Sequence, residues 1–353
     1  MKTYFECIDC KTEIPASVMV NRCSGCNNPL FVSTKTPDAV DNIINLGQGN
    51  TPVIRLRRIG LEFGVSDLWA KLEYLNPTGS FKDRGSATLI SALHAMKINR
   101  LAEDSSGNAG ASIAAYSAKA GINAHIFVPA SAPSVKVLQI AFYNAEVHRI
   151  EGGREQAAIS CYRFCTNHDI IYASHNLSPF FIEGTKQFAY ELIQDMDPVP
   201  DHILFPTGNG SLLLGTWRGF SDMGLHCPKL YAVQSELCAP IVSQFSGKEL
   251  ARHSPKTQTI AGGIAVENPP RLNQCIKAIK TTKGQAISVT ENNISTMQSK
   301  LARLEGLLIE PTSAAALAGI PKLLDQGYIN PSDRILIPLT GSGFKDTLAD
   351  NTS

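Results

Sequence analysis

The chain has 353 residues, and 32 Lys and Arg against 31 Asp and Glu give a net charge of +1 at pH 7. This length allows two domains of ordinary size, and the balanced charge gives no reason to expect a nucleic acid as partner. Lys119 interrupts the Ala-rich segment 109–120, no apolar run could span a bilayer, and the N-terminus lacks an apolar signal core. We therefore expect a cytoplasmic protein that does not contact membranes.

Four of the nine cysteines are clustered near the N-terminus, as the pairs Cys7-x-x-Cys10 and Cys23-x-x-Cys26. An odd number of cysteines without a signal peptide argues against a disulfide framework. Two such pairs suit tetrahedral zinc, and four thiolates would leave no position for water, so the metal would be structural. The sequence thus predicts a zinc-ribbon-like module over residues 1–35, with a reduced, metal-free knuckle as the alternative.

From residue 45 onward, apolar runs typical of strands alternate with segments typical of helices. Such alternation predicts an α/β fold with parallel sheets covered by helices. The expected strands cover 68–73, 124–129, 147–150, 170–173, 202–205, 230–233 and 334–337, and the expected helices cover 86–96, 109–120, 154–167 and 182–196.

Three Gly-rich loops stand where such a fold binds ligands, at the carboxyl ends of strands. They are Ser105–Gly110, Pro206–Ser211 and Leu339–Lys345. Amides and hydroxyls at a helix N-terminus bind carboxylates or phosphates, although each loop alone could also be an ordinary turn or cap. The second loop lacks the Gly-Lys-Ser/Thr of a P-loop, so it does not predict a nucleotide.

Lys82 stands between a Pro/Gly turn and an expected helix, in Asn-Pro-Thr-Gly-Ser-Phe-Lys-Asp-Arg-Gly at 76–85. Most lysines beside a turn are solvated surface charges. A lysine that the backbone holds in place can instead form a Schiff base with an aldehyde cofactor. Lys82 is therefore a candidate for covalent catalysis.

Taken together, these motifs resemble the fold-type II (tryptophan synthase β-like) enzymes of pyridoxal phosphate, and among them threonine synthases most closely. The landmarks are Gly49–Pro52, Asn76–Gly85, Ser105–Gly110, Thr207–Ser211, Glu310–Ala315 and Leu339–Gly343, spread over residues 49–346. The resemblance implies two doubly wound parallel-sheet domains: a large pyridoxal-phosphate-binding domain of residues 36–82 and 176–353, and a small α/β domain of residues 83–175. It also implies a homodimer, and some threonine synthases carry an N-terminal zinc ribbon.

The resemblance assigns roles to named residues. Lys82 would bond to the cofactor and then, as a free amine, move protons at Cα and Cβ of a small amino-acid substrate. Phosphate would leave Cγ of O-phosphohomoserine, and water would add at Cβ to give threonine. Asn108 would bind the cofactor's 3-hydroxyl, and Thr340 would bind its pyridine nitrogen. The cofactor's phosphate would bind Gly208, Asn209, Gly210, Ser211 and Leu212. The substrate carboxylate would bind Ser105 and Ser106, beside Asn108.

The chain departs from the family where the phosphate of the substrate would bind. Phe181 stands where an Asn-Pro-x-Arg-x-Glu-Gly segment would have its arginine, Ala109 replaces a frequent hydroxyl residue, and Ser342 replaces a common histidine. Losing a bidentate arginine contact would cost about 2–3 kcal/mol.

Three hypotheses follow from these departures. Arg154 or Lys186 takes over the phosphate, which keeps the threonine synthase reaction. Alternatively, the substrate lacks a γ-phosphate, and the enzyme is a serine/threonine ammonia-lyase or a β-replacement enzyme of the cysteate synthase kind. The third hypothesis is a non-catalytic scaffold.

Overall fold

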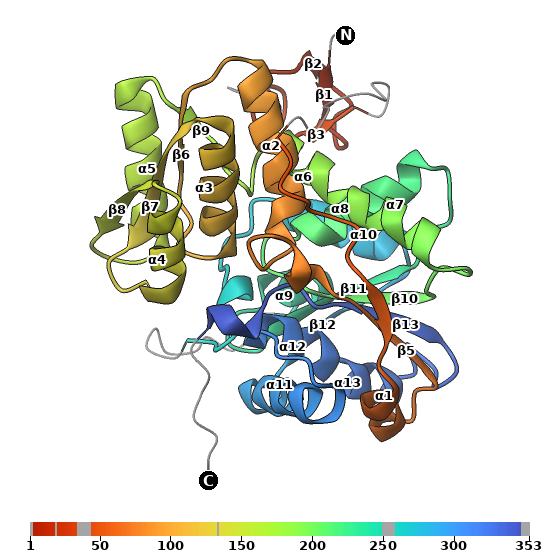
Figure 1. Ribbon diagram of the computed structural model, residues 1–353. Helices are drawn as coiled ribbons and strands as arrows, with labels where there is room; N and C mark the ends of the chain where they lie inside the picture. The colour runs from red at the N-terminus through yellow and green to blue at the C-terminus, as the bar shows by residue number, and fades with distance from the viewer. Residues whose placement is uncertain (1–2, 18–19, 34–43, 133, 249–257, 347–353) are drawn as a thin grey trace. The chain divides into compact units, whose positions relative to one another are not determined.

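The computed structural model describes residues 3–17, 20–33, 44–132, 134–248 and 258–346 (Figure 1). The chain divides into two compact units, one of residues 1–49 and 76–187 and the other of residues 50–75 and 188–353. We call them unit 1 and unit 2. Both hold a mainly parallel sheet with helices, so the predicted α/β class is confirmed. The functional domains expected from the sequence have different bounds and stay a prediction.

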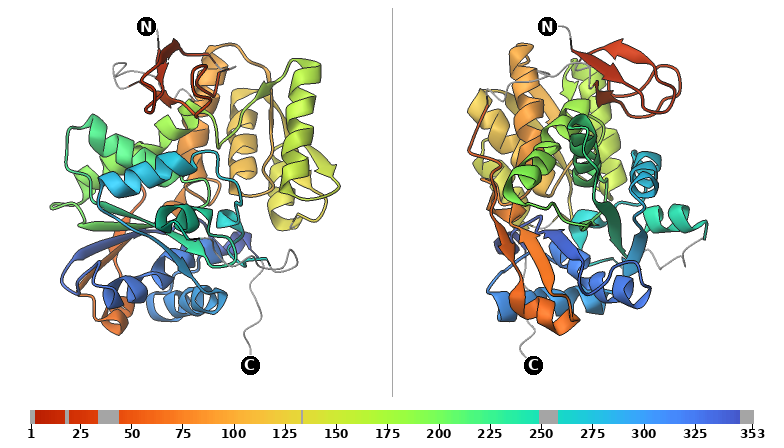
Figure 2. Two further views of the ribbon diagram at one scale, coloured as in Figure 1. Left: turned by 180° about the vertical axis from the view of Figure 1, so that it is seen from behind. Right: turned by 90° about the vertical axis from the view of Figure 1, so that its right-hand side faces the viewer.

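Unit 1 begins with a small antiparallel sheet of strands in the order β2-β1-β3 (Figure 2, right). Its strands are β1 Tyr4–Glu6, β2 Glu13–Pro15 and β3 Phe31–Val32. Phe5 is fully buried, and its ring meets Phe180 edge-on with the centroids 5.2 Å apart. We call residues 3–33 the N-terminal module; its sheet packs against the rest of unit 1 through this ring pair.

The main sheet of unit 1 is parallel, in the order β8-β7-β6-β9. Its apolar side chains alternate between two faces: Ala124 and Ile126 join one core cluster, while Ala102 and Phe127 join another with Cys161. The strands are β6 Arg100–Glu103, β7 Asn123–Pro129, β8 Glu146–Ile150 and β9 Ile171–Tyr172, and the helices are α2 Lys82–Ala95, α3 Asn108–Ala120, α4 Ser134–Phe142, α5 Arg154–His168 and α6 Pro179–Thr185.

The sheet of unit 2 has six strands in the order β12-β11-β10-β13-β5-β4. All neighbours are parallel except the edge strand β4, which runs antiparallel to β5 and was not predicted. The strands are β4 Val53–Arg55, β5 Asp67–Lys71, β10 His202–Pro206, β11 Lys229–Ser235, β12 Ala286–Val289 and β13 Arg334–Pro338. The helices are α1 Arg57–Phe63, α7 Gln187–Asp195 (whose first residue is the last of unit 1), α8 Ser211–Asp222, α9 Pro240–Ser246, α10 Leu272–Thr281, α11 Glu291–Glu305, α12 Pro311–Ala318 and α13 Ile320–Asp325, with short 3-10 turns η1 Glu73–Leu75, η2 Gly262–Ile264 and η3 Gly343–Lys345.

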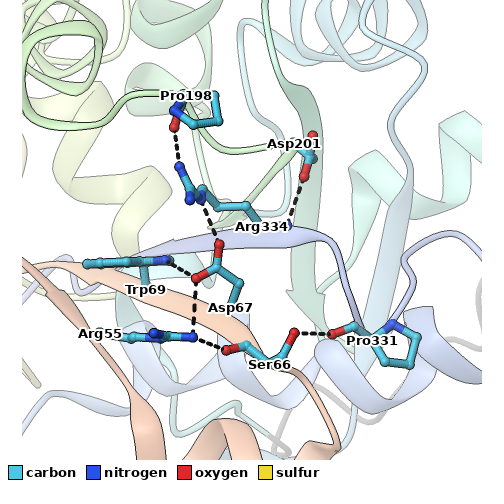
Figure 3. A network of polar contacts seen from close by, with 8 residues as sticks. All are labelled: Arg55, Ser66, Asp67, Trp69, Pro198, Asp201, Pro331 and Arg334. Carbon is cyan, nitrogen blue, oxygen red and sulfur yellow. Dashed lines mark hydrogen bonds and ion pairs between the residues drawn. The ribbon is translucent and has the colours of Figure 1, made fainter.

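A polar network ties β5 to β13 and β4 in unit 2 (Figure 3). The Asp67 carboxylate accepts hydrogen bonds from Arg334 Nε at 2.7 Å and Trp69 Nε1 at 2.9 Å, and Arg55 lies 3.6 Å away. Partial burial alone would raise the pKa of Asp67, but these donors hold it below its ordinary value.

Two predicted helices have different bounds in the structure. The helix expected from Ser86 begins at Lys82, because the Asp83 side chain accepts bonds from Thr78 and so holds the first turn. The helix expected over 182–196 is two helices: Pro179 starts α6 as its first residue, and the Thr185 hydroxyl occupies the Ile182 carbonyl that the Lys186 amide would need. That amide bonds the Glu183 carbonyl instead, and α6 ends.

None of the helices in the described ranges combines the length and the apolar character needed to cross a bilayer.

Candidate functional site

The candidate residues of unit 1 include the start of α2, where Lys82 is the first helical residue. Asp83 is fully buried and accepts hydrogen bonds from the Thr78 amide at 2.7 Å, the Thr78 hydroxyl at 2.5 Å and the Ser112 hydroxyl at 2.6 Å. Its carboxylate therefore fixes the turn before Lys82 to the start of α2 and to α3. The only feature of the sequence that indicates a role for Asp83 is its place directly after the lysine.

Phe181 lies on α6, which crosses α2 close to Lys82. A Cβ added to Gly85 would lie 2.5 Å from the Phe181 ring, and one added to Gly184 would lie 2.1 Å from the Arg84 carbonyl oxygen. The two glycines thus permit the helices to touch. The Phe181 ring is fully buried, and its centroid lies 6.0 Å from Lys82 Nζ.

A buried acid–imidazole pair lies within electrostatic reach of Lys82. Glu103 ends β6, and its carboxyl group bonds the His175 ring and accepts the His175 amide at 3.3 Å. Burial raises the pKa of Glu103 to about 8, although the His175 amide and the Lys82 charge oppose this. Burial, followed by Lys82, lowers the pKa of His175 to about 3. At neutral pH the proton therefore stays on Glu103, and the imidazole is neutral.

The loop after β6 carries the residues expected to bind a carboxylate. Ser105 and Ser106 are partly exposed, and Asn108 is the first residue of α3. A Cβ on Gly110 would lie 1.9 Å from the Ser105 carbonyl oxygen, so the helix start lies directly on the loop. Just before the loop, Asp104 accepts the Tyr172 hydroxyl at 2.6 Å, and burial and then Glu103 raise its pKa to about 6.

The two cations considered for a substrate phosphate differ in the structure. Lys186 is buried, and its amine pairs with Glu183 at 2.6 Å. Arg154 is exposed at the start of α5, and its charge helps to lower the pKa of His175. Of these two, Arg154 alone combines exposure with a place near the Glu103–His175 pair.

Unit 2 has candidate residues of its own, at the loop between β10 and α8. Gly210 has φ +79° at the start of the helix, no side chain caps the helix there, and a Cβ on it would lie 2.1 Å from Cys275 Sγ. A Cβ on Gly208 would lie 3.0 Å from the Gly263 carbonyl oxygen. The first amides of a helix have no intrahelical acceptor, so residues 208–212 form a backbone cradle for an anion.

Thr340 lies at the same end of that sheet, because β10 and β13 are parallel neighbours and both loops follow them. Its hydroxyl is 3.0 Å from Ser313 Oγ, which also accepts the Gly341 amide at 3.0 Å. Gly341 cannot carry a side chain, since a Cβ would lie 2.2 Å from a Glu310 carboxylate oxygen. In the sequence Ser313 is only one residue of the Glu310–Ala315 motif, and in the structure it is the residue that positions Thr340.

Four cysteine thiols converge in the N-terminal module. Cys7 Sγ lies 3.4 Å from Cys26 Sγ, Cys10 Sγ lies 3.4 Å from Cys23 Sγ, and all four sulfurs lie within 4.8 Å of one another. Each Cys-x-x-Cys pair closes a similar turn, in which the amide of the residue after the second cysteine bonds the carbonyl of the first. The structure thus brings the four predicted ligands together.

The family described as pyridoxal-phosphate dependent enzymes matches residues 44–341 of the chain. A threonine synthase of Methanocaldococcus jannaschii is 33% identical over 313 residues, covering 86% of this chain and 77% of the relative. One of Methanosarcina acetivorans is 31% identical over 374 residues, covering 97% and 92%. Among solved structures, serine racemase of Dictyostelium discoideum is similar with a TM-score of 0.70, 26% identity, and coverage of 85% of this chain and 94% of that one. O-ureido-L-serine synthase shares the fold with a TM-score of 0.74 at 19% identity, covering 86% and 94%.

Proposed function

Because this chain belongs to the pyridoxal-phosphate dependent enzymes, we propose that it is a carbon–oxygen lyase of the threonine synthase type, with Lys82 as its catalytic residue. The proposed reaction converts O-phosphohomoserine and water to threonine and phosphate. The observation that carries the proposal is the fixed position of Lys82 at the start of α2, beside a buried Glu103–His175 pair. Similarity to threonine synthases over 86% and 97% of the chain supports this substrate.

The residues of unit 2 fit the proposed cofactor. Gly208 and Gly210 leave their backbone open where side chains would clash, and the 12-residue helix α8 begins there without a side-chain cap, which suits a phosphate ester. The Thr340 hydroxyl would bind the pyridine nitrogen as a neutral partner.

Lys82 would bond to the cofactor and, once displaced by the substrate, take the proton from Cα through its Nζ. When bound, pyridoxal phosphate delocalises the electron pair that proton removal leaves on the substrate. Lys82 would then move a proton at Cβ, while Ser105, Ser106 and Asn108 would hold the α-carboxylate. The Phe81 ring, 4.3 Å from Nζ, and the Phe181 ring would limit the access of water to the amine.

The buried Phe181 favours a second candidate function. Lys186 is buried and pairs with Glu183, which makes it a poor ligand for a γ-phosphate. A substrate without that group would need no cation, and the chain would then be a serine/threonine ammonia-lyase or a β-replacement enzyme.

Steady-state assays of the cofactor-loaded protein distinguish these functions. Phosphate release and threonine formation from O-phosphohomoserine support the first proposal. Turnover of serine or threonine to a keto acid, or of a serine derivative with an added nucleophile, without turnover of O-phosphohomoserine supports the second. A protein that develops no visible absorption band with added cofactor would be a non-catalytic scaffold.

We also propose that Cys7, Cys10, Cys23 and Cys26 bind one structural zinc ion. Four sulfurs at about 2.3 Å from zinc would lie about 3.8 Å apart, close to the arrangement of the four thiols. Metal analysis of protein purified without chelators tests this, with a Cys10→Ser variant as the comparison. Equal zinc contents in the two proteins would contradict the proposal.

A further inference from the structure

A second group of metal-ligating side chains lies in unit 1, outside the candidate site. Among the described residues, His125, Glu146 and His148 bring one ligand atom each within 4.8 Å of one another. His125 is on β7, and Glu146 and His148 are on the edge strand β8. His125 is in register with Glu146 and Phe127 with His148, so strand alternation places the three side chains on one face of the sheet. We call them the His–Glu–His cluster.

The three side chains close a triangle of suitable size for one metal ion. His125 Nδ1 lies 3.2 Å from His148 Nε2 and 3.3 Å from Glu146 Oε2, and His148 Nε2 lies 3.4 Å from Glu146 Oε1. Ligands at 2.0–2.1 Å from a tetrahedral zinc ion are about 3.3–3.4 Å apart, whereas an octahedral arrangement would bring them to about 2.9 Å. The distance between the two imidazole nitrogens is close to one edge of such a tetrahedron, and the Glu146 carboxylate lies at a similar distance from both rings through its two different oxygens.

Aromatic packing holds both imidazole rings in place. Phe127 stacks on His148 with centroids 4.3 Å apart and an interplanar angle of 11°, and Phe164 of α5 lies 4.9 Å from the His125 ring. His168 in turn packs on Phe164 at 4.3 Å and bonds its carbonyl oxygen. Rings held in this way lose little freedom when a metal binds.

The cluster is accessible from solvent and separate from the candidate site. The Glu146 side chain is 65% exposed, while His125 and His148 are 15% and 24% exposed, so a cation can reach the ligands without opening the fold. Helix α5 begins at Arg154, whose charge acts on His175. Phe164, which packs against the imidazoles of the cluster, comes ten residues later, or about 15 Å further along the helix.

We propose that His125, Glu146 and His148 form a binding site for a divalent transition-metal cation of the zinc class that joins the edge strand β8 to β7. Two imidazoles with one carboxylate favour zinc, cobalt or nickel over magnesium or calcium, which prefer oxygen ligands. Three protein ligands leave a position for water. Because the site lies on the edge strand β8 and its neighbour β7, its effect is on the stability of unit 1.

Cobalt(II) titration of the full-length, cofactor-loaded protein tests the proposal. Cobalt held by the four cysteines shows thiolate-to-metal charge-transfer bands, and cobalt in the His–Glu–His cluster does not. We expect the wild type and Cys10→Ser each to bind one equivalent of cobalt that does not show those bands. Glu146→Gln should bind it at least about tenfold more weakly, since even the loss of an outer partner costs about 10–100-fold. His94→Gln, which changes an exposed histidine of α2, should bind as the wild type does.

Thermal unfolding gives a second readout. Zinc should raise the unfolding temperature of Cys10→Ser and should not raise that of Cys10→Ser with Glu146→Gln. Glu146 is mostly exposed, so its replacement is expected to leave the fold intact, as circular dichroism can verify. A wild type that binds no cobalt beyond the thiolate-bound equivalent, or equal affinities in the wild type and Glu146→Gln, would show that the cluster is only a hydrogen-bonded group.

Discussion

The candidate residues of the two units differ in chemistry. Unit 2 offers backbone: Gly208 and Gly210 open a cradle at the start of α8, and Thr340 is a neutral hydroxyl held by Ser313. Unit 1 offers buried ionisable and aromatic side chains, with Lys82 beside Glu103, His175 and Phe181. Backbone amides bind any phosphate ester alike, whereas buried side chains differ in charge and shape. We therefore expect unit 2 to set cofactor affinity and unit 1 to set the reaction and its substrate.

The largest effect is expected in unit 1, from Lys82→Ala. Removing the amine that would move protons at Cα should lower kcat on the order of 10³-fold or more. The cofactor should still bind through unit 2, without its covalent bond. Steady-state kinetics measures kcat, and mass spectrometry after borohydride reduction detects the covalent bond to the cofactor. Lys119→Ala, which changes an exposed lysine of α3, is the control. Covalent labelling that persists in Lys82→Ala would place the attachment elsewhere.

Gly210→Ala should mainly weaken cofactor binding, for every substrate alike. Its Cβ would lie 2.1 Å from Cys275 Sγ at a residue with φ +79°, so we expect a loss of about 2–4 kcal/mol in stability. Gly224→Ala has φ +65° and no atom within 4 Å of the new Cβ, so it tests strain without a clash. Adding Cys275→Ala should restore part of the affinity in a fluorescence titration. No restoration would mean that the Cys275 contact is unimportant.

Phe181→Leu should change the choice of substrate while leaving cofactor affinity as in the wild type. A smaller side chain in this buried position should cost about 1–3 kcal/mol of stability and leave space near Lys82. The ratio of kcat/KM values for two substrates is the measurement. Phe180→Leu, also buried but with its ring against Phe5, is the matched control. Equal changes for all substrates in both variants would contradict a role in selection.

Glu103→Gln should change the pH dependence of stability. Between the ordinary value of 4.5 and about 8, the folded wild type holds a proton on Glu103 that the unfolded chain releases. The free energy of unfolding therefore falls as pH rises through this range, and Gln removes the fall. The stability of the wild type relative to Glu103→Gln should decrease from pH 5 to pH 8 in urea titrations. A constant difference would show that burial does not raise the pKa of Glu103.

Asp67→Asn should give the smallest effect and touches neither part of the candidate site. Its hydrogen bonds to Arg334 and Trp69 are partly exposed, so a loss of about 1 kcal/mol in stability is expected. The pKa of Asp67 is lowered, so its contribution is present at neutral pH and is lost as pH falls below its ordinary value of 3.8. Unchanged kcat/KM at pH 7 checks that the network is structural.

How much the sequence could predict depends on whether a feature follows from local or from long-range interactions. The loops at Ser105, Thr207 and Leu339, and the strands at 124–129, 202–205 and 334–337, follow from glycines and apolar runs, which are local signals. Glu103 and His175 are 72 residues apart, and their partnership arises only from the pairing of β6 with β9. The short β6 was missed because Arg-Leu-Ala-Glu has no β-branched residue or apolar run.

Through the edge-on contact between Phe5 and Phe180, the N-terminal module covers part of the hydrophobic core of unit 1. A chain shortened to start at residue 44 would not merely lose an appendage. It would expose the Phe180 ring to water and remove a support from α6, the helix that carries Phe181. The four cysteines and Phe181 are far apart in sequence, yet this one ring contact connects the module that holds the cysteines to the helix that holds Phe181.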